Sequence, residues 1–316
     1  YKNLGLACQG QGRYSEAGRC FIAAVQAEAA DPRALRCLEE LVAAHPGPTH
    51  SSPSAGSPDT ALLTAFTAQN MMWRSVDGGA TWSYIGFGGM DLGPRDTSIS
   101  ISDPDLTADA AGNIYHVSLY NPGEAQAGLG MAVSSDDGVT WTASPLEPGG
   151  DRPWISARGE HYVFVAVHGS IYRSVPGSQG IKLQKVGDSP YSQPDTNLQV
   201  GPDGALYHGG FTGVARSTDD GATWTELPNE MTPASGHGWM MAEPVFDDAG
   251  NLYATWFAEG DLFYGVWSPA GEWVGEWQVT DLPGTHLWPW MVAGADGRIA
   301  LAWLGSLEAE SPDSDV

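Results

Sequence analysis

Residues 217–224 read STDDGATW, and the same pattern occurs twice more, as SVDGGATW at 75–82 and as SSDDGVTW at 134–141. Shorter remnants stand at 174–177 (SVPG) and 268–273 (SPAGEW). Self-similarity at regular intervals indicates a repeat architecture. The chain from residue 61 onward is therefore built from repeats. The shared residues are Ser75, Asp77, Gly79 and Trp82; Ser134, Asp136, Gly138 and Trp141; and Ser217, Asp219, Gly221 and Trp224.

A second repeated element alternates with these eight-residue segments. It consists of a proline-led strand, a Gly or Asp-Gly turn and an aromatic-rich strand, and its prolines are Pro104, Pro153, Pro194, Pro244 and Pro289. The spacings of 49, 41, 50 and 45 residues match the length of one four-stranded propeller blade. Each unit has two apolar faces, which only neighbours arrayed around an axis can bury. The pattern predicts a β-propeller.

The eight-residue repeat resembles the Asp-box, or BNR repeat, and residues 61–316 resemble the sialidase-like Asp-box propellers over their whole length. The resemblance implies that each box forms the hairpin between the third and fourth strands of a blade. Ser and Asp would bond turn amides, Gly would take a conformation closed to residues with a Cβ, and Trp would pack between sheets. We therefore interpret the box as a fold signature. Arg74, Arg173 and Arg216, which precede boxes, are expected to be structural edge residues.

The sequence predicts three strands in a first unit, sixteen in four complete units and two in a last unit. These twenty-one strands are three fewer than six closed four-stranded blades require. We expect an all-β, six-bladed propeller whose last blade is truncated in this sequence. An open seam is the alternative, but it would expose unpaired strand edges.

The amino-terminal residues have a different character. Residues 1–45 show helical spacing of apolar residues, and Leu4, Gly12, Tyr14, Phe21 and the pair Asp31-Pro32 resemble one tetratricopeptide repeat followed by a further helix. The resemblance implies a docking surface for a protein partner on these helices. Residues 46–60 are rich in Pro, Ser and Gly and are expected to form a flexible linker.

Charge and composition exclude several classes. Asp and Glu number 38 against 14 Lys and Arg, so no nucleic-acid partner is expected. The sequence contains no run of 18 apolar residues, so no membrane span is predicted. The cysteines Cys8, Cys20 and Cys37 all precede the propeller, which therefore has no disulfide framework. We predict no cofactor and no metal, because the boxes lack the spacing of a calcium loop. The Asp-box resemblance implies an extracellular or cell-envelope location, because such propellers are often exported when they lack cysteine, whereas the tetratricopeptide resemblance leaves the cytoplasm open.

The ligand site of a propeller is expected where the innermost strands begin, around the repeated prolines. Carboxylates, arginines and tryptophans gathered there suit a carbohydrate, because aromatic faces pack on sugar C–H surfaces and polar groups bond hydroxyls. The alternative is that the tryptophans only seal blade interfaces. The candidate ligand-binding residues are Arg95, Asp151, Arg152, Trp154, Asp195, His237, Trp239, His286, Trp288 and Trp290.

The arginines and carboxylates of the propeller bear on whether it is an enzyme. The sialidase resemblance implies a clamp of three arginines with an Asp acid and a Tyr nucleophile. Of the seven arginines in the propeller, three precede boxes, and Arg158 and Arg298 fall in turns at the far end of the blade, which leaves Arg95 and Arg152. For a generic glycoside hydrolase, the candidate catalytic residues are Asp103, Asp105 and Glu243. His116 and His208 are interpreted as core histidines, not zinc ligands.

Three functions remain open at this point. The first is a recognition domain for a glycan or a protein at the central face. The second is an exo-glycosidase, sialidase-like, whose catalytic set is completed by sequence beyond this chain. The third is a non-enzymatic assembly scaffold. A fold alone does not decide among them.

Overall fold

The computed structural model describes residues 61–65, 71–86, 88–89, 100–121, 128–146, 152–167, 169–191, 197–210, 212–233, 244–258, 261–280, 286–295 and 297–305. Within these ranges every regular element is a β-strand, as expected for an all-β domain. The same ranges contain no helix long and apolar enough to cross a membrane. The helices predicted for residues 1–45 and the linker at 46–60 lie outside the described residues.

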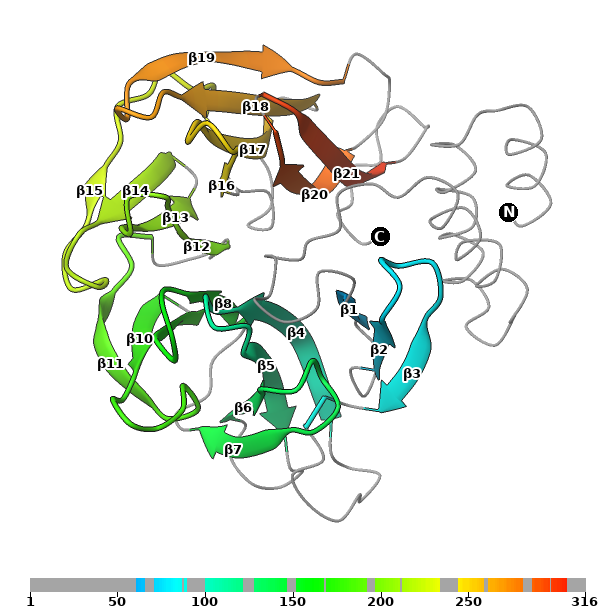
Figure 1. Cartoon of the computed structure of the whole chain (residues 1–316). Helices are drawn as coiled ribbons and strands as arrows, with labels where there is room; N and C mark the ends of the chain where they lie inside the picture. The colour runs from blue at the N-terminus through cyan, green and yellow to red at the C-terminus, as the bar shows by residue number, and fades with distance from the viewer. Residues whose placement is uncertain are drawn as a thin grey trace, which may run out of the picture.

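The strands form six antiparallel sheets that follow the order of the chain (Figure 1). Sheet 1 has three strands, sheets 2 to 5 have four each, and sheet 6 has two. Closure of the ring into six full blades stays a prediction. Sheet 1 holds β1 (Ala61–Ala65), β2 (Met71–Ser75) and β3 (Ser83–Gly86); sheet 2 holds β4 (Ser100–Ala108), β5 (Ile114–Asn121), β6 (Gly128–Ser134) and β7 (Thr142–Leu146); sheet 3 holds β8 (Trp154–Ala157), β9 (Val163–Val167), β10 (Ser170–Ser174) and β11 (Leu183–Asp188); sheet 4 holds β12 (Leu198–Val200), β13 (Leu206–Gly210), β14 (Gly213–Ser217) and β15 (Thr225–Glu226); sheet 5 holds β16 (Val245–Phe246), β17 (Leu252–Ala258), β18 (Asp261–Trp267) and β19 (Trp273–Gln278); sheet 6 holds β20 (His286–Ala293) and β21 (Ile299–Gly305).

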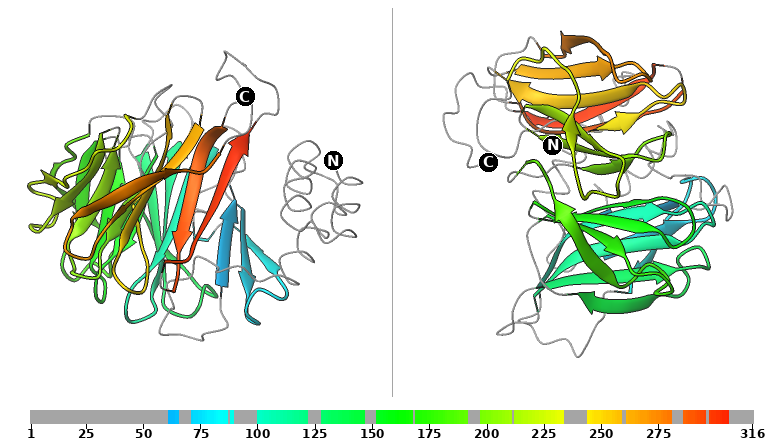
Figure 2. Two further views of the ribbon diagram at one scale, coloured as in Figure 1. Left: turned by 90° about the horizontal axis from the view of Figure 1, so that it is seen from above. Right: turned by 90° about the vertical axis from the view of Figure 1, so that its left-hand side faces the viewer.

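The sheets are arranged radially, as a propeller requires. In Figure 1 the strands β4, β8, β12, β16 and β20 lie nearest the middle of the ring, and β3, β7, β11, β15 and β19 lie at its rim. Figure 2 shows the same sheets standing side by side in two further views. Neighbouring sheets touch through their inner strands, for example β4 with β8, β8 with β12, and β16 with β20.

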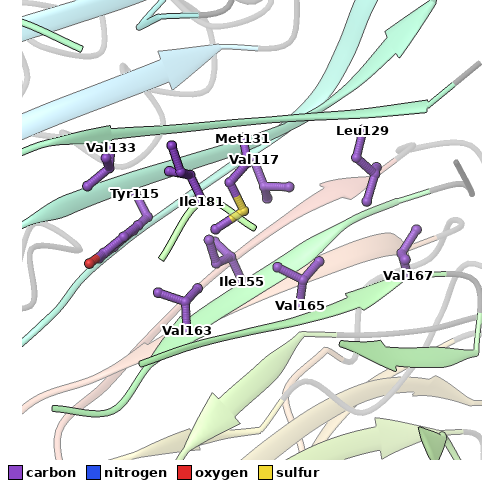
Figure 3. Packing of buried hydrophobic residues seen from close by; sticks show 10 residues of the cluster. All are labelled: Tyr115, Val117, Leu129, Met131, Val133, Ile155, Val163, Val165, Val167 and Ile181. Atoms are coloured by element: carbon purple, nitrogen blue, oxygen red, sulfur yellow. The ribbon is translucent and has the colours of Figure 1, made fainter. Parts of the chain in front are cut away.

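The core lies between the sheets, because each sheet is apolar on both faces. In β9 the side chains of Val163 and Val165 face sheet 2, whereas Phe164 faces sheet 4. Burial of each such side chain stabilises the fold by about 1.5–3 kcal/mol. Figure 3 shows the cluster between sheets 2 and 3, which consists of Tyr115, Val117, Leu129, Met131, Val133, Ile155, Val163, Val165, Val167 and Ile181.

Each complete eight-residue repeat forms the hairpin between the last two strands of its sheet. In the copy at 134–141, Ser134 Oγ donates to Asp136 Oδ1 (2.8 Å) and accepts from the amide of Gly138 (2.9 Å). The carboxylate of Asp136 accepts from the amide (2.8 Å) and hydroxyl (2.6 Å) of Thr140, and Trp141 Nε1 donates to the Gly138 carbonyl (3.2 Å). The same bonds recur in the other two copies, at 75–82 and 217–224. The repeat forms a turn, as the Asp-box resemblance implied.

A second device, which we call the turn latch, joins neighbouring sheets. Asp109, in the turn after β4, accepts hydrogen bonds at Oδ2 from the hydroxyl of Tyr115 (2.9 Å) in its own sheet and from the amide of His161 (2.8 Å) in sheet 3. Asp247 does the same with the hydroxyl of Tyr253 (3.0 Å) and the amide of Gly297 (3.0 Å) in sheet 6. The sequence analysis did not predict these latches.

His161 stands where the turns between the first and second strands of sheets 2, 4, 5 and 6 have glycine. Two residues before the second strand, those turns have Gly112, Gly204, Gly250 and Gly297, all with φ between 74° and 86°. His161 adopts the same left-handed backbone with φ of 57°. Its amide is held by Asp109 (2.8 Å) and its carbonyl by the hydroxyl of Ser174 (3.0 Å), so the neighbouring sheet and its own sheet together impose this conformation.

The imidazole of His161 extends the first latch. Its Nδ1 lies 2.7 Å from the hydroxyl of Tyr115. Burial alone would raise the pKa of Asp109, but hydrogen bonds from His161, Asn113 and Tyr115 lower it below its usual value, so this carboxyl is ionised. The Tyr115 hydroxyl therefore donates a hydrogen bond to Asp109 and accepts one from His161 Nδ1–H.

Candidate functional site

The proline-led starts of the inner strands lie at the opposite end of the sheets from the box hairpins. Consecutive strands run antiparallel within each sheet, so the start of the first strand and the turn between the third and fourth strands fall at opposite ends. Arg158 and Arg298, in turns between first and second strands, lie at the box end, as predicted. The candidate site is therefore the hub at the proline end.

Two of the predicted residues meet at the hub. The ring centroids of Trp154 in β8 and Trp290 in β20 are 5.7 Å apart, with 35° between the ring planes. These strands belong to sheets 3 and 6, which are not neighbours in the ring, so the contact crosses the middle of the molecule (Figure 1). Trp290 is 39% exposed. We call Trp154 and Trp290 the hub pair.

The indole nitrogen of Trp154 is a buried donor. Its Nε1 has no hydrogen-bond partner among the described residues. Buried polar groups in folded proteins are nearly always hydrogen-bonded, so such an atom calls for an explanation.

Asp105 holds the strand that carries Trp154. Its Oδ2 accepts from the amide of Ile155 (2.8 Å) in sheet 3, and its Oδ1 accepts from the amide of Leu106 (2.8 Å). Burial raises the pKa of Asp105 to about 7, even though both amides favour its charged form. The carboxyl group thus joins sheet 2 to the residue that follows Trp154.

Asp103 and Arg152 have strained backbones at the edge of the hub. Their φ values are 49° and 54°, in the left-handed region, and each residue directly precedes a proline. The residue before proline normally adopts an extended conformation. Such outliers cost about 1–3 kcal/mol each and cluster at functional sites. Because of this backbone geometry, Asp103 and Arg152 remain candidate residues of the functional site.

Irregular pairing accompanies two of the repeated prolines. The register of β4 against β5 shifts between Ser102 and Asp105, and that of β20 against β21 shifts between Leu287 and Trp290. Proline cannot donate to the sheet, and a bulge re-aims the side chains that follow it. Asp105 and Trp290 both follow such an irregularity directly.

The remaining predicted residues are placed differently. His286 is buried at the start of β20, and its ring lies edge-on to Trp303 with centroids 6.4 Å apart. Trp288 belongs to β20. Arg95, Asp151, Asp195, His237, Trp239 and Glu243 lie outside the described residues.

His116 and His208 belong to the core, as predicted. Both are fully buried, and each packs on the tryptophan of its own box, Trp141 and Trp224 respectively. Burial lowers the pKa of His116 to about 4, so its ring is neutral at physiological pH. Among the described residues, no group of three or more His, Cys, Asp or Glu side chains could hold a metal ion.

The arginines of the box end are engaged in structural contacts. Arg158 and Arg173 of sheet 3 both bind the carboxylate of Asp220 in sheet 4, at 2.6 Å and 2.7 Å. Arg216 binds Asp203 at 2.6 Å. Arg74 donates to the backbone carbonyl of Asp137 in the neighbouring box, at 2.5 Å. The prediction that the arginines before boxes are structural is confirmed.

Comparison with known proteins gives no family assignment. No family model matches the chain, and no curated protein does. Among solved structures, the chain is similar to a catalytically inactive virginiamycin B lyase from Staphylococcus aureus with quinupristin, with a TM-score of 0.50, 12% identity and 79% of each chain covered. At such low identity the likeness shows the fold alone, and it agrees with a propeller.

Two further structures have lower scores. YCF48 bound to D1 peptide has a TM-score of 0.48 and 17% identity, with 72% of this chain and 68% of that chain covered. The GH74 xyloglucanase from Xanthomonas campestris has a TM-score of 0.49 and 16% identity, with 79% of this chain and 34% of that chain covered.

Proposed function

We propose that this propeller is a recognition domain that binds its ligand at the hub, on the hub pair. The contact of Trp154 with Trp290 across the ring is the observation that carries the proposal. Trp290 is 39% exposed, and its ring contacts that of Trp154. Exposed aromatic faces supported from behind, with polar groups close by, are typical of binding sites for small molecules and glycans.

The state of Asp105 supports recognition over hydrolysis. Both of its carboxylate oxygens already accept backbone hydrogen bonds, one of them from the next sheet. A general acid or nucleophile must reach the substrate within hydrogen-bond distance. In this arrangement Asp105 acts on the site indirectly, by positioning the strand of Trp154.

A glycoside hydrolase is the second candidate, and one observation favours it. The raised pKa of Asp105, about 7, is what a general acid needs at neutral pH. In that function Asp105 or Asp103 would protonate the leaving group and Glu243 would supply the second carboxylate. Asp105 would then have to release the amide of Ile155 during the reaction.

Binding and turnover separate the two candidates. Glycan and peptide arrays probed with the whole chain measure binding, and fluorogenic glycosides measure hydrolysis. Recognition predicts binding that Trp290→Ala abolishes, without turnover. Trp277→Ala is the matched control, because Trp277 is another exposed tryptophan (44%) but lies on the rim strand β19. Turnover that Asp105→Asn abolishes would instead establish the hydrolase.

We also propose a cellular location for the protein and a partner for its amino-terminal helices. We propose an extracellular or cell-envelope setting from the Asp-box resemblance, because Asp-box propellers without cysteine are often exported and residues 61–316 contain no cysteine. A protein partner on residues 1–45 is proposed from the tetratricopeptide resemblance alone. Fractionation of cells and a pull-down with residues 1–60 deleted test the two proposals separately.

A further inference from the structure

We propose that the outer part of sheet 6 is a docking site for a β-hairpin of a partner protein, which adds two strands beside β21. The site lies toward the rim, apart from the hub, so the inference goes beyond the proposed function and does not depend on it. Three observations support it: the number of strands in sheet 6, two exposed aromatic pairs that flank this sheet, and the sequence that follows β21.

Sheet 6 ends at its second strand among the described residues. Sheets 2 to 5 each have a third and a fourth strand outside the second. The second strands β9, β13 and β17 are buried along their whole length, whereas Ala300 and Ala302 of β21 are exposed. β21 reads IALAWLG and contains neither a charged residue nor a proline. An apolar edge strand without such protection can pair with another chain.

On the side of sheet 5, an exposed aromatic pair faces sheet 6. Tyr264 of β18 and Trp277 of β19 lie opposite each other in the register, and their rings stack with centroids 5.3 Å apart and 20° between the planes. Tyr264 packs against the cluster that sheet 5 forms with β20 and β21, so the pair lies on the face toward sheet 6. The described strands of sheet 6 leave Trp277 44% exposed.

On the side of sheet 1, a second pair has the same arrangement. Trp73 of β2 and Tyr84 of β3 lie opposite each other in the register, with ring centroids 5.8 Å apart. The next residue, Arg74, bonds to Asp137 of sheet 2, so Trp73 and Tyr84 point away from sheet 2. In Figure 1 sheet 6 is the neighbour on that other side. Tyr84 is 52% exposed.

The two aromatic pairs define where the added strands would lie. Each pair joins the last two strands of its sheet, which in sheets 2 to 5 are the third and the fourth. The pairs therefore flank the places that a third and a fourth strand of sheet 6 would take. Exposed apolar surface of this kind marks an interaction site. A hairpin with apolar side chains on both faces would cover Trp277 with one face and Tyr84 with the other.

The sequence after β21 favours a partner protein as the source of the hairpin. In sheets 2 to 5 the third strand begins three to seven residues after the second strand ends. At the equivalent place after Gly305 this chain reads SLEAESPDSDV, which contains four carboxylates and a proline. Carboxylates and proline are depleted in strands, so this sequence does not predict a third strand. Addition of strands from another polypeptide to an exposed sheet edge is an established mode of recognition.

Hairpins taken from this chain serve as probes. The third and fourth strands of the complete sheets, with their turns, correspond to the peptides 128–146, 170–188, 213–226 and 261–278. Each peptide is labelled with fluorescein and titrated with the whole chain, and binding is followed by fluorescence anisotropy. A scrambled version of each peptide is the control. We expect at least one hairpin to bind and its scrambled version not to bind. Hydrogen exchange of the β21 amides should slow when that hairpin is added.

Three substitutions test the location of the site. Trp277→Ala and Tyr84→Ala are each expected to weaken hairpin binding by at least about tenfold, because each removes an aromatic surface that the hairpin covers. Val139→Ala is the matched control, since Val139 is an exposed apolar residue (63%) in the box of sheet 2. It should leave the affinity unchanged. Near-ultraviolet circular dichroism checks that each variant is folded.

Several outcomes would overturn the proposal. One is failure of all four hairpins to bind, and another is binding that neither Trp277→Ala nor Tyr84→Ala weakens. Self-association of the chain that is lost in Trp277→Ala would identify a second copy as the occupant instead. A longer product of the same gene that no longer binds the hairpins would show that the added strands belong to this polypeptide. Binding at the hub is measured separately with Trp290→Ala, so none of these outcomes decides the proposed function.

Discussion

The carboxylate of Asp105 accepts a hydrogen bond from the amide of Ile155 in the next sheet of the ring, over 2.8 Å. This contact fixes the start of β8 against β4, and with it the position of Trp154. Asp105, a candidate catalytic acid from the sequence, therefore holds the residue that follows Trp154. Its burial also gives the protein a measurable response to pH.

Stability is expected to fall as pH rises from about 4 to about 7, because of Asp105. Its pKa is raised from 3.8 to about 7 in the folded state, so over this range the folded chain binds a proton that the unfolded chain has lost. The loss between pH 5 and pH 8 is on the order of 2–3 kcal/mol, and it is nearly complete at pH 8. Urea denaturation at pH 5 and pH 8 measures it.

Asp105→Asn provides the control for that response. The amide oxygen of Asn still accepts from Ile155, but it does not titrate. The difference in unfolding free energy between the two proteins should therefore change between pH 5 and pH 8, with the variant relatively more stable at pH 8. Identical pH dependence in both proteins would contradict the assignment.

His161→Gly is expected to be more stable than His161→Ala by about 1 kcal/mol, because both lose the imidazole but only alanine keeps a Cβ in the left-handed region. The backbone φ of 57° suits glycine, which the four other turns use at this position. Denaturation of the two variants at one pH gives the comparison. Equal stabilities would mean that the turn relaxes to another backbone conformation.

Ser134→Ala is expected to destabilise the fold by about 1–3 kcal/mol, because the buried amide of Gly138 loses its acceptor. Ser170→Ala is the matched control. The hydroxyl of Ser170 makes an exposed hydrogen bond of 3.2 Å to Asp188, so its loss should change stability by less than about 0.5 kcal/mol. A small effect at both positions would show that the hairpin forms without the serine.

Gly221→Ala is expected to destabilise the protein more than Gly79→Ala, although the two glycines occupy the same position of their boxes. Both have φ near 90°, so both substitutions incur the same backbone strain. A Cβ at residue 221 would lie 2.6 Å from Ile171 Cγ2 in the neighbouring sheet, whereas at residue 79 its nearest neighbour is Trp82 at 3.7 Å. Thermal unfolding of the two variants compares them directly, and equal losses would contradict close packing at Ile171.

The fold could be predicted from the sequence because its main signals are local. The Asp-box resemblance of residues 134–141 already implies a hairpin, and its bonds run between residues at most four apart in the chain. Strand periodicity and the repeated prolines set the order of the sheets. None of this requires knowledge of contacts between sheets.

The site could be predicted only in part, because its contacts are distant in the chain. The dipeptides Pro153-Trp154 and Pro289-Trp290 show that both tryptophans follow a repeated proline, and so identify them as candidates. Their meeting depends on the curvature of the whole ring. The bond from Asp105 to Ile155 spans 50 residues, and that between Asp109 and His161 spans 52, so neither has a local signal.

The turn latch also bears on how such a chain can lengthen. Each of the two latches consists of an aspartate and a tyrosine in one sheet and a backbone amide in the next. A copied unit that keeps the aspartate and the tyrosine can therefore bond to the unit after it through that unit's main chain. The amide is a main-chain group, so the acquired junction survives even when the residue that carries it changes from glycine to histidine.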